Sequence, residues 1–173
     1  TNKVGFIGGM ESPVISKFDY GFRAGVKAAN PDAEVMVQYA NSFTDSALGK
    51  TIANQMHSKN ADIIFTCAGA VGIGAIEAAK ENGKKAIGVD QDQNSLAPEN
   101  VITSAMKNID VSVEEMLSKV VDGSYKGGEI IVNTLAMNGV GIPQSSEKNV
   151  PPDVLTYVKE EAEKVKSGEV KVP

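Results

Sequence analysis

Short apolar runs alternate along the first hundred residues with longer segments in which apolar side chains recur every three or four positions. The runs at residues 3–8, 62–66 and 86–89 predict buried β-strands, and residues 34–39 alternate enough for a fourth strand. The segments between the strands have the period of a helix. Because successive strand-helix units connect through right-handed crossovers, this pattern predicts an α/β fold with a parallel sheet and helices on both faces.

The limits of the predicted helices are marked by residues typical of helix ends. Ser12 followed by Pro13 is an N-cap with proline at the first helical position. Either Asp45 or Ser42 can cap the second helix, and Gly83 ends the third.

The pattern is less regular after Asp90. It predicts a short strand at residues 101–105, a helix at 109–121, a strand at 129–135 and a final helix at 153–167. One face of the final helix is apolar, which predicts packing on the sheet, through Val154, Tyr157, Val158 and Val165. The helix at 109–121 carries a second apolar stripe, formed by Ile109, Val113, Met116, Leu117 and Val120.

Composition limits the partners and the chemistry of the chain. Its 173 residues carry a formal net charge of −5, which argues against a nucleic-acid or anionic-membrane partner. Cys67 and His57 are the only cysteine and histidine, so a disulfide within the chain, a zinc site and a catalytic triad all lack the side chains they need. We expect Cys67 to pack in the core, His57 to lie on the surface, and the chain to need no metal or cofactor.

Several candidate ligand contacts follow directly after predicted strands. Gly8-Gly9, Gly69 and Asp90 stand at the carboxyl ends of three strands, which meet at one rim of a parallel sheet where small ligands bind. A carboxylate there can accept hydrogen bonds from two neighbouring hydroxyls, as on a ribose. The alternative is that Asp90 caps a loop. Asp92, two residues further on, is expected to point elsewhere.

Aromatic residues stand beside the same turns. Phe18 and Phe43 both lie next to strand-to-helix connections, where flat apolar faces suit a planar ligand, although either can instead belong to the core. The glycines of residues 69–74, beginning with Gly69, have the spacing G-x-x-G-x-G, which does not match the dinucleotide fingerprint G-x-G-x-x-G. These residues predict a planar, hydroxyl-bearing ligand and do not identify it.

With these motifs in place, the chain resembles the basic membrane lipoprotein family, the purine-nucleoside-binding lipoproteins of bacterial ABC importers. The resemblance implies the type I periplasmic-binding-protein fold, a purine nucleoside ligand such as guanosine, inosine or adenosine, and an ABC permease as partner. The matching segments are VGFIGG near the start, F-x-x-G-F-x-A-G at 18–25, N-S-F-x-D at 41–45, G-K at 49–50, A-D-I-I-F at 61–65, A-G-x-x-G-x-G at 68–74, A-A-K-E at 78–81, I-G-V-D-x-D-Q at 87–93, V-I-T-S-x-x-K at 101–107 and the terminal S-G-E-V-K-V-P.

The resemblance also assigns roles to individual residues. It implies that Phe18 and Phe43 line the ligand pocket, that Gly69 allows a backbone contact, and that Asp90 binds the ribose hydroxyls. Lys107 would approach the ligand from the hinge side. Family members are extracytoplasmic and lipid-anchored, whereas no signal peptide, lipidated cysteine or long apolar run is found in these 173 residues.

Family members are also two-lobed clamshells of roughly twice this length, so the chain is expected to be mostly the second lobe. Residues 1–100 would form the α/β domain, 101–127 a crossover segment that packs on the first lobe, and 128–173 a return strand and C-terminal helix. A single lobe would bind nucleoside weakly and associate with itself through its uncovered apolar stripe.

Two other functions fit a sheet-rim site. The same fold serves as the effector domain of transcription regulators, so a regulatory sensor is the main alternative. A nucleoside-processing enzyme is the third hypothesis, for which the chain offers neither a cluster of metal-binding carboxylates nor an activated base.

Overall fold

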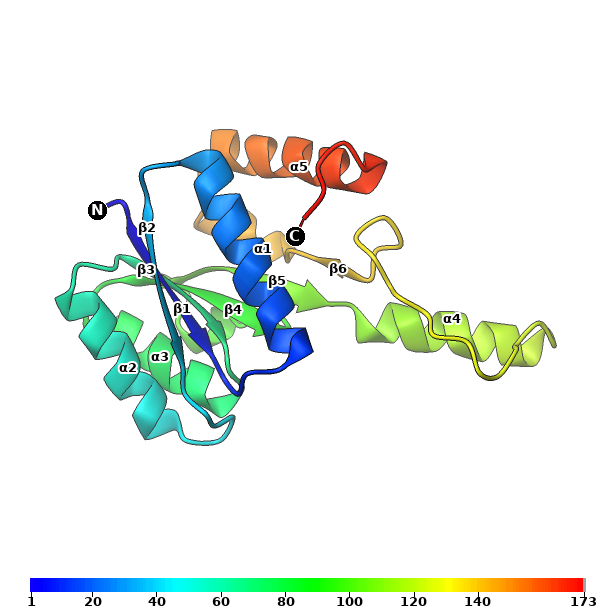
Figure 1. Ribbon diagram of the computed structural model, residues 1–173, viewed down its shortest axis with the longest axis horizontal. Helices are drawn as coiled ribbons and strands as arrows, with labels where there is room; N and C mark the ends of the chain where they lie inside the picture. Colours follow the sequence, from blue (N-terminus) through cyan, green and yellow to red (C-terminus); the bar gives the residue numbers. More distant parts are fainter. Residues whose placement is uncertain (173) are drawn as a thin grey trace.

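The computed structural model describes residues 1–172 (Figure 1). The strands are β1 (Lys3–Gly8), β2 (Glu34–Tyr39), β3 (Ile63–Cys67), β4 (Lys85–Asp90), β5 (Val101–Lys107) and β6 (Val140–Gly141). The helices are α1 (Pro13–Ala29), α2 (Ser46–Ser58), α3 (Ala70–Glu81), α4 (Ile109–Val121) and α5 (Pro152–Ser167), with short 3-10 helices η1 (Asn94–Leu96) and η2 (Gln144–Lys148).

All six strands belong to one sheet, in the order β2-β1-β3-β4-β5-β6. The first five are parallel, and β6 pairs antiparallel with the end of β5. The predicted α/β class and parallel sheet are confirmed. The sheet order places the ends of β1, β3 and β4 next to one another, as the rim argument requires.

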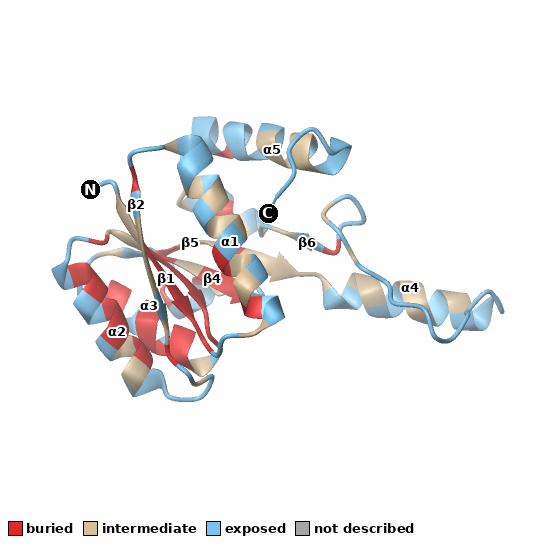
Figure 2. Ribbon diagram, in the orientation of Figure 1, coloured by how far each residue is buried: buried red, intermediate tan, exposed pale blue. Residues whose placement is uncertain are grey.

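The sheet separates two cores because successive residues of a strand point to opposite faces. On one face, Phe6 of β1 and Phe65 of β3 pack with α1, their ring centroids 5.5 Å apart. On the other face, Ile7 and Ile64 pack beneath α2 and α3. Figure 2 shows that buried residues are concentrated in these central strands and in α2 and α3.

Two glycines allow α2 and α3 to approach each other closely. A Cβ atom at Gly49 would overlap the backbone carbonyl of Val71, and one at Gly74 would overlap that of Ser46. Any side chain at either position would push the helices apart. The contact therefore fixes the N-terminal turn of α3, which follows the end of β3 at the rim.

The predicted helix caps are also found. The Ser12 hydroxyl accepts a hydrogen bond from the backbone N–H of Ile15 at 3.3 Å, and Pro13 is the first residue of α1. Of the two candidates for α2, Asp45 is the cap, since its carboxylate accepts from the N–H of Leu48 at 2.9 Å.

The segment around α4 leaves the body of the protein. We call residues 109–133, which comprise α4 and the chain that returns beside it, the α4 arm (Figure 1). No residue of α4 is buried, and Leu117, in the middle of the helix, is 59% exposed. The apolar stripe predicted for this helix exists, but no described residue of the body covers it.

The predicted strand at 129–135 is wrong. These residues form no strand and return along α4, where Ile131 lies beside Met116, while Ile130 is 93% exposed. A strand needs a neighbouring strand for its backbone N–H and C=O groups, and the described chain offers none at this place. The last strand is instead β6, and β5 extends two residues beyond its predicted end, to Lys107.

Two further expectations require correction. On α5, Val154, Tyr157 and Val158 are exposed and only Leu155 is buried, so the predicted apolar face does not pack on the sheet. His57 is buried, with 7% of its surface exposed, because α2 turns it toward the loop at Ala61, whose carbonyl lies 3.1 Å from Nδ1. Burial lowers the pKa of His57, and nearby Lys84 lowers it further.

Within residues 1–172, no helix combines the length and the apolar character needed to cross a membrane.

Candidate functional site

The candidate site lies at the rim formed by the carboxyl ends of the central strands. The backbone N–H of Gly9, just after β1, donates to the carbonyl of Cys67 at the end of β3 at 3.0 Å, which ties these two ends together. A cavity of about 580 Å³ opens at the neighbouring ends of β4 and β5. Its lining residues come from β4, β5, α3, α4 and their connections: Gly69, Ile73, Val89, Asp90, Gln91, Gln93, Met106, Lys107, Asn108, Ile109 and Asp110.

Asp90 and Lys107 form an ion pair at the mouth of this cavity. Nζ of Lys107 lies 2.8 Å from Oδ1 of Asp90, and the two side chains are 34% and 55% exposed. The pair forms because Asp90 at the end of β4 stands opposite Met106, the neighbour of Lys107 on β5. Since both groups are reachable from solvent, a ligand can compete with the pair or bridge it. Among the described residues, no backbone N–H donates to the Asp90 carboxylate, which removes the support for a purely loop-capping role.

Phe18 reaches the same place from α1. The Lys107 ammonium lies 5.1 Å from the centroid of the Phe18 ring, within the range of a cation–π contact. The ring also packs edge-on against Phe65, with 6.2 Å between centroids. Phe18 therefore belongs partly to the core, as the alternative foresaw, and partly to the surroundings of the ion pair.

Phe43 and Gly69 form a second part of the rim. The carbonyl of Phe43 accepts a hydrogen bond from the N–H of Ala70 at 2.8 Å, and a Cβ at Gly69 would stand 2.8 Å from the same oxygen. Gly69 also has a φ of +58°, which favours glycine. The Phe43 ring lies directly over Gly9, where any side chain would overlap it. With 39% of its surface exposed, Phe43 is not a core residue.

The structure thus brings Phe18, Asp90 and Lys107 together, and Phe43 and Gly69 together, along one rim. Gly69 belongs to both groups, because it also lines the cavity beside Asp90. The rim offers an aromatic face, a carboxylate and an ammonium. Such a set can hold a planar, hydroxyl-bearing molecule through stacking and hydrogen bonds.

The single cysteine and the single histidine, Cys67 and His57, do not line this cavity. Cys67 is buried beneath the rim, and desolvation raises its pKa to about 12, so the thiol stays protonated near neutral pH. The expectation that Cys67 packs in the core is confirmed. Within residues 1–172, no three histidine, cysteine or acidic side chains are grouped closely enough to hold a metal ion.

The sequence argument missed several residues of the cavity. Met106 and Asn108 line it from the end of β5, and Asp110 lines it from the first turn of α4. Predicting their place required the true end of β5 at Lys107, whereas the apolar pattern suggested Ala105. The polar residues after Asp90 gave one usable signal, since a polar segment directly after a buried strand marks a rim loop.

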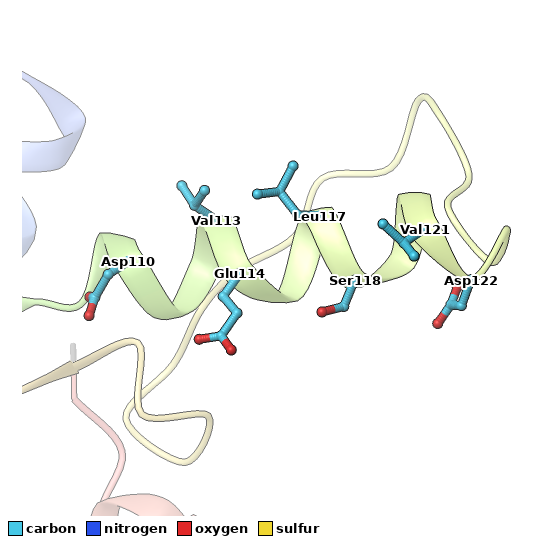
Figure 3. Close-up of a pocket in the computed structure, with 7 residues that line it drawn as sticks. All are labelled: Asp110, Val113, Glu114, Leu117, Ser118, Val121 and Asp122. Carbon is cyan, nitrogen blue, oxygen red and sulfur yellow. The ribbon is translucent and has the colours of Figure 1, made fainter.

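A larger hollow, of about 650 Å³, lies on the α4 arm and does not form a ligand site. All its lining residues belong to α4 or, for Asp122, follow it directly, so no opposite wall exists (Figure 3). Figure 3 shows Val113 and Leu117 pointing to one side of the helix and Asp110 and Glu114 to the other. A small ligand would be bound from one side only, which makes this hollow a bare helix surface.

Comparison with known proteins identifies the family. A family model described as "ABC transporter substrate-binding protein PnrA-like" matches residues 1–173. The chain belongs to this family. "ABC transporter nucleoside-binding protein BmpA" of Lactococcus lactis is 36% identical over 190 residues, covering the whole chain and 53% of that protein. "Basic membrane protein B" of Borreliella burgdorferi is 39% identical over 177 residues, covering the whole chain and 50% of that protein.

Solved structures share the fold of this member of the PnrA-like family. A solute-binding protein of an ABC transporter system from Aeropyrum pernix K1 has a TM-score of 0.87 at 27% identity, covering 99% of this chain and 58% of that one. A transcriptional activator from Bacillus halodurans also has a TM-score of 0.87, at 21% identity, which shows a shared fold alone. The chain spans about half the length of the curated relatives it matches.

Proposed function

We propose that this chain supplies one side of a purine nucleoside site in the substrate-binding component of an ABC importer. The observation that carries the proposal is the rim itself, where the Asp90–Lys107 pair lies against Phe18 and near Gly69 and Phe43. In this proposal the aromatic faces stack with the purine, and the Asp90 carboxylate accepts hydrogen bonds from the ribose hydroxyls. Guanosine, inosine and adenosine are the candidate ligands.

Membership of the PnrA-like family and the similarity to the nucleoside-binding protein BmpA of Lactococcus lactis support this ligand class. The whole protein would act outside the cytoplasm, anchored to the membrane by lipid, and would deliver the nucleoside to an ABC permease unchanged. The regulatory alternative gains no support beyond the shared fold.

The first experiment titrates the 173-residue chain with inosine, guanosine and adenosine and follows the backbone amide signals by NMR, which detects weak binding. We expect shifts at Gly69, Asp90 and Lys107 and smaller ones for ribose or the free base alone. Asp90→Ala should weaken nucleoside binding by about 1.5–3 kcal/mol, the size of a lost hydrogen bond to a charged group. Asp32→Ala, in the exposed turn after α1, is the matched control.

The same samples test for catalysis. Chromatography after incubation, with and without phosphate, should return the nucleoside intact. Free base that accumulates in proportion to the chain and disappears in Asp90→Ala would contradict a transport function.

The NMR titration has its own contradicting outcome. Signals that shift equally in wild type and Asp90→Ala would remove Asp90 from the site.

A further inference from the structure

Asp90 is held in an uncommon backbone conformation at the rim. Its φ is +69°, in the left-handed region that residues other than glycine seldom adopt. The N–H of Gln91 donates to the carbonyl of Val89 at 2.8 Å, which closes a three-residue γ-turn with Asp90 at its centre. This type of γ-turn is rare and strained, so the surrounding structure must hold it in place.

The side chain of Gln93 forms a hydrogen bond to the residue directly before this turn. Its Oε1 accepts a hydrogen bond from the N–H of Val89 at 3.0 Å, directly before Asp90. The N–H of Gln93 itself donates to Oγ of Ser104 on β5 at 3.1 Å, and Ser104 is fully buried. Gln93 thereby ties the loop to both strands, to β4 through its side chain and to β5 through its backbone N–H.

Gly88 makes room for this arrangement. A Cβ at Gly88 would stand 2.6 Å from both Oε1 of Gln93 and Oγ of Ser104. The three residues form one unit, which we call the Gln93 clamp: Gly88, Gln93 and Ser104. The side chain of Asp90 then points to Lys107, whose Nζ lies 2.8 Å from Oδ1.

We propose that Gln93 is a positioning residue for ligand binding, which acts by holding Asp90 in the strained turn that aims its carboxylate at the cavity. This inference rests on the proposed nucleoside-binding function. Gln93 also lines the cavity, so a direct ligand contact is the competing explanation. A substitution of Ser104 distinguishes positioning from direct contact. The Ser104 hydroxyl is fully buried, so it cannot touch a ligand and acts only through the clamp.

The test measures inosine affinity by NMR titration of the 173-residue chain. Gln93→Met keeps the length of the side chain but removes the acceptor for Val89, and should weaken binding about three- to tenfold. Gln93→Glu keeps an oxygen acceptor and should bind within about twofold of wild type. Ser104→Ala should reproduce the direction of the Gln93→Met effect, and Gln55→Met, on the exposed side of α2, should bind like wild type.

Two further measurements decide between positioning and contact. In an Asp90→Ala background, Gln93→Met should have almost no additional effect, because the residue that it positions is gone. The three-bond HN–Hα coupling of residue 90, measured without ligand, should lose its left-handed value in Gln93→Met. A full effect of Gln93→Met in the Asp90→Ala background, or wild-type binding by Ser104→Ala, would overturn the proposal.

Failure of the proposed function gives a different result. Wild-type chain that shows no nucleoside-dependent shifts contradicts nucleoside binding, while an unchanged coupling at residue 90 in Gln93→Met contradicts the clamp without any ligand. If Gln93→Met does not fold, the comparison of Ser104→Ala with wild type carries the test.

Discussion

The helices α2 and α3 and the helix of the α4 arm all present apolar side chains, but only those of α2 and α3 are buried. The helices α2 and α3 bury Ile52, Met56 and Val71 against the sheet, whereas α4 buries no residue. The difference lies in what each apolar face meets. An amphipathic pattern in the sequence predicts that one face of a helix is apolar. Whether that face is buried depends on the elements that the rest of the fold places against it.

The largest expected difference between the two regions concerns stability. Ile64→Ala removes a fully buried side chain from the core beneath α2 and α3, and should lower the free energy of unfolding by about 2–5 kcal/mol. Leu117→Ala on the α4 arm should change it by less than about 0.5 kcal/mol, since the side chain is already exposed. Denaturant unfolding measures both. A loss for Leu117→Ala comparable to that for Ile64→Ala would show that the arm is covered in solution.

A smaller effect on stability is expected from a change of pH, and it arises from His57 in the body of the protein. Burial lowers the pKa of His57 below its unfolded value of about 6.5, with Lys84 adding to the shift. The unfolded chain therefore binds a proton first as the pH falls, so stability is full above about pH 6.5 and is lost as the pH drops through the folded pKa. The fall in melting temperature between pH 7.5 and 5.5 should be smaller in His57→Gln. An identical fall in both proteins would show that His57 does not contribute.

The smallest effect on stability is expected on the arm, with a visible effect on association. The double variant Val113→Lys, Leu117→Lys places charges on the exposed apolar side of α4 and should leave the melting temperature unchanged. Wild-type chain should show a mass that rises with concentration in light scattering, because an uncovered apolar stripe favours contact between copies. The variant should remain monomeric. Wild-type chain that is monomeric throughout the same range would contradict self-association through the arm.

Local sequence rules predicted the body well because its elements are determined by short-range patterns. The three strand-helix units from β1 to α3, the strand β4 and the caps at Ser12 and Asp45 follow from periodicity and from side chains that bond their own backbone. The strand expected at 129–135 failed for the opposite reason, since it depends on a neighbour that the apolar pattern does not reveal. His57 was misplaced because it was judged from the polar Ser58 and Lys59 that follow it, whereas it continues the buried face of α2 one turn after Ala53.

The site was predicted in its members but not in its geometry. The rule that strand ends meet at one rim was enough to select Gly69 and Asp90. It gave no means of pairing Asp90 with Lys107, because that contact depends on the register of β4 against β5, which shifts between Ala86 and Ile87. The left-handed turn at Asp90 was equally hidden, since aspartate favours many other loop conformations.

The direct passage from β5 into α4 also has a mechanical consequence. Asn108 is the single residue between Lys107 and the helix, and its N–H donates to the carbonyl of Gly139 at 3.0 Å. A tilt of α4 would therefore be centred on Asn108. The 13 residues of α4 extend about 20 Å, so a rigid tilt of about 5° moves the tip by about 2 Å. Lys107 lies next to Asn108, the point of rotation, and therefore moves far less than the tip. A small rotation at Asn108 therefore displaces the tip of α4 much more than it displaces Lys107.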